Sequence, residues 1–202
     1  LVMALCVPKL IRRMDKTKLF MISALAATVL SLLVVPTQNS LVLFIITFTL
    51  RSIPLGVIGV LSFTFTPDCA EYGQYTTGTD AKGITFAIQT FAVKLAAAIS
   101  GSLGLILLGF FSFKTKFMVD GVEAEISTFA DLQAIDAISQ QSAEALKGLW
   151  FTYNVVPIIG LVIALILWAF YKLNDKDVQI MADYNVGKIT REEAESKLSR
   201  KY

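Results

Sequence analysis

The sequence predicts an all-α membrane protein with about four complete transmembrane helices and the end of a fifth. Hydrophobic residues make up 55% of the 202 residues. The mean hydropathy of +0.65 is well above that of a soluble domain. Several apolar stretches reach the length that a helix needs to cross a bilayer, about 20 residues at about 1.5 Å each. Spans are expected at residues 19–35, 41–66, 83–113 and 148–171.

The first half of the chain alternates apolar and polar stretches. Residues 1–7 look like the end of a helix that begins upstream, and residues 8–18 form a basic loop. Proline and glycine inside the second span indicate a kink and a close neighbour. Pro67 is expected to end that span, which leaves residues 67–82 as a loop.

The second half holds a long polar segment and a charged tail. Residues 114–147 are expected to lie outside the membrane, with a turn at 119–122 and a surface helix over 129–146. Thr190 followed by Glu193 is a capping box that starts a short helix in the tail. The chain therefore divides into a transmembrane bundle, residues 1–172, and a tail, residues 173–202.

Lys94 lies in the middle of the third span. Eleven residues of helix place it about 16 Å deep, where a lysine costs on the order of 3 kcal/mol unless it faces protein, water or a ligand. The same helix face is small or polar: Gly83, Ala87, Thr90, Lys94, Ala97, Gly101 and Gly104. One interpretation is a functional site around Lys94. The other is a helix–helix contact in which the lysine side chain extends toward the membrane surface.

Charge is distributed unevenly over the chain. Lys94 and Arg51 lie inside the predicted spans, whereas all sixteen acidic residues lie outside them. Buried cations need partners, so substrate, water or carboxylates from other helices are expected to supply them. Residues 8–18, 67–82 and 172–202 carry thirteen Lys and Arg residues, against three on the other side. The positive-inside rule then predicts that the C-terminus is cytoplasmic.

Two motifs carry a resemblance to a known family. The stretch DCAEYGQYTTG at residues 68–78 and the stretch KGITFAIQTFAVKLAAAISG at 82–101 resemble the glycoside–pentoside–hexuronide:cation symporters. This is the melibiose permease-like family of the major facilitator superfamily, which has a 12-helix fold. The resemblance implies that the chain is the C-terminal half of such a transporter and lacks the N-terminal six helices.

The resemblance also implies roles for particular residues. Gln89, Thr90, Val93 and Lys94 would bind the sugar, and Lys94 would also couple sugar to cation. Asp68 and Glu71 would belong to a charged cytoplasmic gate, and their spacing of three residues would let both carboxylates reach one basic partner. Arg12 and Arg13 would either join this gate or only set topology. Where many members of the family carry Arg and Glu, this chain has Asp80 and Lys82, so the ion-pair pattern of the family is not expected intact.

The function expected from these features is symport of a sugar or glycoside with Na⁺ or H⁺ by alternating access. A major facilitator transporter of a non-sugar solute, such as a drug or organic anion, is the first alternative. A membrane enzyme is disfavoured because the chain has no His and no nucleophile–base pair in the spans. A non-transporting scaffold is the remaining alternative.

The other expectations concern partners and location. No cofactor, metal or nucleic-acid partner is expected, and the coupling cation would be bound mainly by the missing N-terminal half. The expected partners are the sugar, the lipid bilayer and that half. Cys6 and Cys69 are expected to be free thiols. The protein is expected in the plasma or inner membrane as a multi-pass protein.

Overall fold

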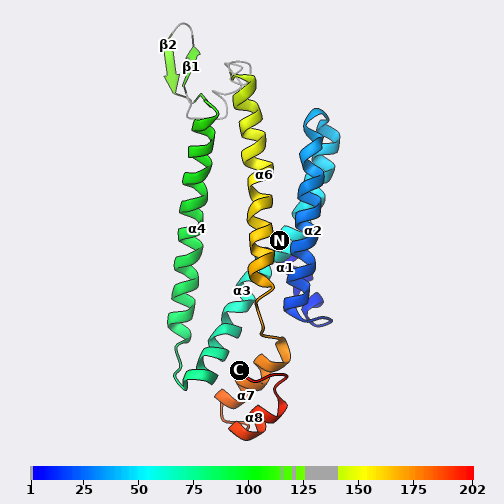
Figure 1. Cartoon of the computed structure of the whole chain (residues 1–202), viewed down its shortest axis with the longest axis vertical. Helices are drawn as coiled ribbons and strands as arrows, with labels where there is room; N and C mark the ends of the chain where they lie inside the picture. The colour runs from blue at the N-terminus through cyan, green and yellow to red at the C-terminus, as the bar shows by residue number, and fades with distance from the viewer. Residues whose placement is uncertain (1, 115, 120–121, 126–140) are drawn as a thin grey trace. The chain divides into compact units, whose positions relative to one another are not determined.

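A computed structural model describes residues 2–114, 116–119, 122–125 and 141–202 (Figure 1). These residues are helical except for one short hairpin and the connecting loops. The helices are α1 Val2–Ile11, α2 Lys16–Val34, the 3-10 helix η1 Val35–Asn39, α3 Leu41–Thr77, α4 Lys82–Phe110, α6 Ala143–Trp168, α7 Asp175–Asn185 and α8 Arg191–Lys197. The strands are β1 Lys116–Val119 and β2 Val122–Glu125.

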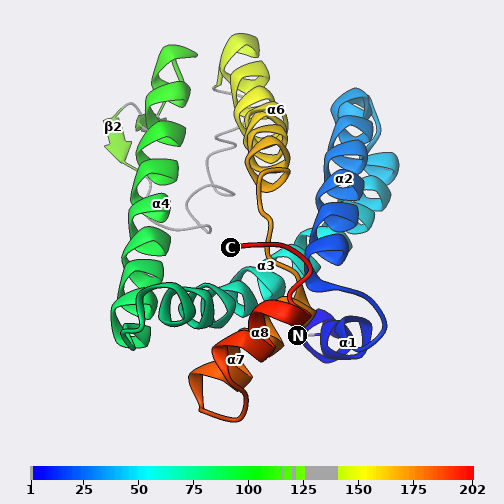
Figure 2. The ribbon, with the colours of Figure 1, turned by 60° about the horizontal axis from the view of Figure 1, so that its bottom comes forward.

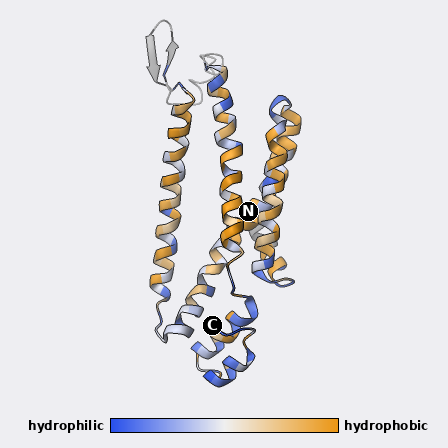
Figure 3. Cartoon of the chain, in the orientation of Figure 1, coloured by the Kyte–Doolittle hydropathy of each residue, from blue (hydrophilic) through white to orange (hydrophobic). Residues whose placement is uncertain are grey.

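Four helical segments among these residues are long and apolar enough to cross a membrane. They are Lys16–Asn39, Leu41–Thr77, Lys82–Phe110 and Ala143–Trp168. Figure 3 shows apolar residues along their length and polar residues gathered in α7 and α8. The predicted fold class, an all-α membrane protein, is confirmed.

The chain forms two compact units, residues 1–95 with 159–202 and residues 96–158. The first unit has an aromatic and aliphatic core between α2, α3 and the end of α6. Phe20 of α2 stacks on Trp168 at 4.2 Å between ring centroids, and Phe65 of α3 meets the same indole edge-on at 4.5 Å. Small residues on the buried face of α2, including Ala24 and Ala27, permit close approach to α3, as is usual between membrane helices.

Helix α3 is longer than the sequence predicted. Pro67 does not end it, because the helix continues through the proline to Thr77. A proline removes one backbone donor, but a neighbouring packed helix and polar side chains make this tolerable in a membrane protein. Gly78 ends the helix instead, with φ of 72° and its N–H donated to the carbonyl of Gln74 at 2.9 Å. Figure 2 shows the second half of α3 turning away from α2 toward the start of α4.

The basic loop is shorter than predicted, for a similar reason. Helix α1 contains Pro8 and runs on to Ile11, so residues 12–15 alone connect it to α2. Asp15 then caps α2, its carboxylate accepting a hydrogen bond from the N–H of Thr17 at 2.9 Å.

The tail contains one predicted helix and one that was not predicted. Helix α8 begins with the capping box of Thr190 and Glu193, in which both reciprocal hydrogen bonds are present. Helix α7 precedes it and packs against the second half of α3 (Figure 2). A second apolar cluster lies there: Tyr75, Leu173, Val178, Met181 and Ala194.

Asp177 of α7 connects this helix to the C-terminal segment of the tail. Its carboxylate accepts hydrogen bonds from the backbone and hydroxyl of Ser199, from the hydroxyl of Tyr202 at 2.7 Å and from the amide of Asn174 at 2.9 Å. Burial alone would raise the pKa of Asp177, but these hydrogen bonds outweigh burial and hold the pKa below its ordinary value. Burial and, second to it, the hydrogen bond to Asp177 raise the pKa of Tyr202 to about 12.

The second unit holds the second half of α4, the hairpin and the first half of α6. Strands β1 and β2 are antiparallel, with Val119 opposite Val122, which agrees with the turn predicted at 119–122. The hairpin strands themselves were not predicted. The side-chain amide of Gln141 pairs with the backbone of Lys114 through two hydrogen bonds, of 3.0 and 2.8 Å. The surface helix predicted over 129–146 falls largely outside the described residues.

We expect Asp177→Ala to release the C-terminal segment. The change leaves the donors of Ser199, Tyr202 and Asn174 without their acceptor, at a cost of about 1–3 kcal/mol. Hydrogen exchange of residues 191–202 should then become faster at pH 7, whereas Asp183→Ala, at a more exposed ion pair, should change it little. Because the folded-state pKa of Asp177 is lowered, its contribution is present above the unfolded pKa of about 3.9. It is lost as the pH falls through the folded-state value. Unchanged exchange in Asp177→Ala would contradict this role.

Candidate functional site

The predicted binding residues lie together on α4. Gln89, Thr90, Val93 and Lys94 fall within two turns, and helix geometry at about 100° per residue keeps them on one broad face. All are exposed or only partly buried, and α4 buries none of its 29 residues against the described part of the chain. This face is therefore accessible to a ligand or to another helix.

Two of these residues donate side-chain hydrogen bonds to backbone carbonyls. The side-chain amide of Gln89 donates to the backbone carbonyl of Ser62 on α3 at 3.4 Å. The hydroxyl of Thr90 donates to the carbonyl of Phe86 at 2.9 Å within α4. The carbonyl oxygen of the Gln89 amide has no partner among the hydrogen bonds of the described residues, so it remains able to accept one from a ligand.

Lys94 and Arg51 are the two cations within the apolar part of the spans. Lys94 forms no ion pair with any described residue. Arg51 of α3 is 7% exposed, and its guanidinium lies 5.2 Å from the ring centre of Phe48. Its Nε and Nη1 atoms find no hydrogen-bond acceptor within the described ranges. Burying two nitrogen donors without acceptors is costly, so we expect an acceptor for Arg51 from outside the described residues.

A group of charged residues connects the beginnings of α2 and α7 to α3. We call Asp15, Lys16, Asp68 and Asp175 the ion-pair network. The Lys16 ammonium lies 2.6 Å from one carboxylate oxygen of Asp68 and 3.4 Å from Asp175. The backbone N–H of Lys16 donates to Asp175 at 2.9 Å, and that of Asp175 donates to Asp15 at 3.0 Å. Each helix start thus binds the carboxylate at the start of the other, which suits the positive ends of both helix dipoles.

Glu71 forms a separate contact on the next turn of α3. Its carboxylate lies 2.7 Å from the Lys82 ammonium at the start of α4. It also accepts a hydrogen bond of 2.8 Å from the side-chain amide of Asn185 at the end of α7, which donates to the backbone carbonyl of Glu71 as well. Glu71 therefore joins α3, α4 and α7.

These contacts correct two predictions about Asp68 and Glu71. The two residues lie in a helix, not in a loop, because α3 continues through Pro67. They do not share one basic partner: Asp68 pairs with Lys16 and Glu71 with Lys82. A spacing of three residues turns the two side chains about 60° apart, which is enough to direct them at different helices.

The predicted gate cations are not the ones that pair. Arg12 and Arg13 are exposed and form no ion pair with any residue that the structure describes. Lys16 does so instead, and sequence reasoning missed it along with Lys82, Asp175 and Asn185. A signal for Lys16 was present, because Asp15 is a helix-capping residue and therefore fixes the residue after it at the start of a helix.

Comparison with known proteins finds one family model and several similar proteins. A family model described as "MFS/sugar transport protein" matches residues 1–175. The chain is 28% identical over 171 residues to a "Glucuronide carrier protein homolog" of Escherichia coli (strain K12), covering 84% of the chain and 33% of the relative. It is 27% identical over 177 residues to an "Uncharacterized symporter YnaJ" of Bacillus subtilis (strain 168), covering 87% and 33%.

A further relative is named for a sugar. The chain is 26% identical over 129 residues to an "Isoprimeverose transporter" of Lactiplantibacillus pentosus, covering 63% of the chain and 22% of the relative. The chain spans about a third or less of the length of these relatives. No significant match to a solved structure was found.

We expect the Lys16–Asp68 pair to be energetically coupled. Asp68→Asn and Lys16→Gln should each lower the free energy of unfolding by about 1–3 kcal/mol, because each leaves a largely buried charge with a weaker partner. The double variant should lose less than the sum of the two single changes. Thermal unfolding in detergent measures this, with Arg12→Gln as the control for loss of one exposed positive charge. Strict additivity of the two changes would refute the coupling.

Proposed function

Since the chain belongs to the MFS/sugar transport protein family, we propose that it is the C-terminal half of a sugar or glycoside symporter driven by Na⁺ or H⁺. It is a multi-pass membrane protein and a transporter rather than an enzyme. The observation that carries the proposal is the open face of α4, where Gln89 and Thr90 lie within two turns of a lysine deep in an apolar helix. The relatives named as a glucuronide carrier homologue and an isoprimeverose transporter support a sugar as the solute.

In this proposal the α4 face supplies one wall of the binding site. Gln89 offers amide donor and acceptor groups and Thr90 a hydroxyl, which are the groups that sugar hydroxyls pair with. Val93 gives an apolar contact for a sugar ring. The site would lie near the membrane midplane between the two halves of the transporter, as is usual for secondary transporters.

Lys94 is proposed to couple cation to sugar. Carboxylates that bind a cation repel one another when the cation is absent, and a nearby ammonium relieves that repulsion. Binding of Na⁺ or H⁺ would then free Lys94 from the carboxylates. Such a role needs a compact, movable charge, which lysine supplies and a planar guanidinium does not. The remaining helices of the transporter would supply the carboxylates.

A second candidate function rests on the same cations. Arg51 has nitrogen atoms without acceptors among the described residues, and Lys94 forms no ion pair there. An organic anion bound between the halves would pair with Lys94. Transport of a non-sugar anion by the same alternating-access mechanism therefore remains the alternative.

We further propose the plasma or inner membrane as the location, with the C-terminus in the cytoplasm. The excess of thirteen basic residues over three supports this orientation. The ion-pair network and the Glu71–Lys82 pair would then lie at the cytoplasmic end. There they would hold α2, α3, α4 and α7 together and help to close the inward side.

For this gate we expect the double change of Asp68→Asn and Glu71→Gln to slow uptake while sugar binding is largely kept. Without the two carboxylates the inward-open form should be favoured, and the free thiol of Cys69, which burial partly shields in this structure, should be alkylated faster from the cytoplasmic side. The measurement uses the whole transporter in vesicles with Cys6→Ser, so that Cys69 reports alone within this half. Asp183→Asn, at the more exposed pair with Lys188, is the matched control. Loss of sugar binding with unchanged thiol reactivity would exclude a gate.

For coupling we expect Lys94→Leu to abolish cation-driven sugar accumulation by the whole transporter, even when the protein inserts normally. Lys94→Arg should keep part of the activity, because the charge remains but its shape differs. Accumulation in vesicles is measured against the amount of protein in the membrane. Lys114→Leu makes the same substitution beyond the end of α4 and should leave accumulation unchanged. Wild-type accumulation by Lys94→Leu would show that the lysine is structural.

A further inference from the structure

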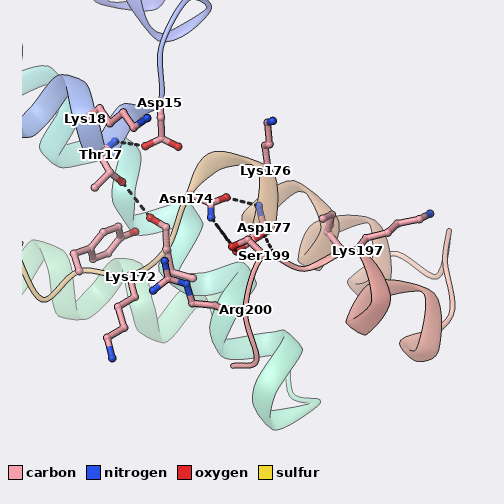
Figure 4. A pocket seen from close by; sticks show the side chains of 13 residues that line it. Asp15, Thr17, Lys18, Lys172, Asn174, Lys176, Asp177, Lys197, Ser199 and Arg200 are labelled. Carbon is pink, nitrogen blue, oxygen red and sulfur yellow. Dashed lines mark hydrogen bonds between the residues drawn. The ribbon is translucent and has the colours of Figure 1, made fainter.

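A cavity of about 540 Å³ lies in the first unit, away from the α4 face (Figure 4). It is formed by the start of α2, the segment that joins α6 to α7, helix α7 and the residues after α8. The cavity has an apolar part lined by Tyr171, Leu173 and Ile180. Its volume lies within the range of ligand pockets, about 300–1,000 Å³.

The rest of the lining is strongly basic. Five cationic side chains line the cavity: Lys18, Lys172, Lys176, Lys197 and Arg200. All five are exposed, and none forms an ion pair within the described part of the chain. Figure 4 shows Lys176 and Lys197 extending away from Asp177 and Ser199, and Lys172 extending in another direction.

The two carboxylates of the cavity do not neutralise these cations. Asp15 accepts hydrogen bonds from the N–H groups of Thr17 and Asp175. Asp177 accepts them from Asn174, Ser199 and Tyr202. Both carboxylates therefore hold helix starts and the C-terminal segment in place, while five positive charges against two negative ones leave the cavity with an excess of +3.

The cavity also lies at the ends of two candidate membrane spans. One span begins at Lys16 and another ends at Trp168, within three residues of lining residues Lys18 and Tyr171. Lipid headgroups lie at this level, and basic pockets between transmembrane helices are suited to bind anionic ones.

We propose that this cavity binds the phosphate of an anionic phospholipid. The lysines supply point charges and Arg200 a guanidinium fork that fits phosphate oxygens. The apolar part would hold the start of the acyl chains. A lipid is favoured over a soluble phosphate because the cavity has this apolar side and lies beside the membrane spans. The site does not depend on which solute the protein transports.

The test is native mass spectrometry of the whole transporter, purified in detergent. Phosphatidylglycerol and phosphatidylcholine with identical acyl chains are titrated separately, and glycerol 3-phosphate serves as the soluble phosphate. The cavity variant is Lys172→Gln, Lys176→Gln and Arg200→Gln. The control variant is Lys9→Gln, Lys114→Gln and Lys116→Gln, which removes the same charge from exposed positions elsewhere. A variant with Lys172→Arg and Lys176→Arg keeps the charge.

We expect tighter binding of phosphatidylglycerol than of phosphatidylcholine. Near a membrane surface each basic residue changes affinity by about fivefold, so the cavity variant should bind phosphatidylglycerol at least about tenfold more weakly. The control and the arginine variant should stay within about twofold of the wild type. Equal weakening in the cavity and control variants would show general charge attraction and overturn the site. Binding of glycerol 3-phosphate as tight as that of phosphatidylglycerol would overturn the lipid assignment.

Discussion

The arrangement of the first unit depends on one interaction, the pairing of Lys16 with Asp68 and Asp175. These three residues come from the start of α2, the second half of α3 and the start of α7, which are distant in the sequence. Charge-assisted hydrogen bonds of this kind are worth about 1.5–3 kcal/mol each. Because the network also occupies the N–H groups at the starts of α2 and α7, it fixes both where these helices begin and how they meet.

The sequence predicted the helices of the membrane better than their polar ends. Hydropathy locates a span well because a bilayer demands about 20 apolar residues in a row. The predicted end of α3 was wrong because Pro67 removes only one backbone donor, and the helix beyond it stays packed against α7. Helix α7 was missed since its apolar residues, Val178 and Met181, are few and face α3 and α8 rather than lipid.

The proximity of the candidate binding residues could be predicted from the sequence, but the ion-pair partners of Asp68 and Glu71 could not. Gln89, Thr90, Val93 and Lys94 lie within two turns of one helix, so their proximity follows from helical periodicity alone. The partners of Asp68 and Glu71 come from other helices, and sequence spacing says nothing about such contacts. Arg12, Arg13 and Lys16 carry the same charge within five residues, and only the N-cap at Asp15 determines which of them faces α3.

The exchanged charges at Asp80 and Lys82 are consistent with the local structure. The Asp80 carboxylate accepts a hydrogen bond of 3.1 Å from the N–H of Lys82, and an acidic group at the start of α4 is favoured by the helix dipole. A lysine in the first turn is disfavoured by the same dipole. Its ammonium instead reaches Glu71 at 2.7 Å, which offsets that cost. The ion pair between Glu71 and Lys82 therefore connects α3 to α4, and Lys82 supplies its positive charge from the start of α4.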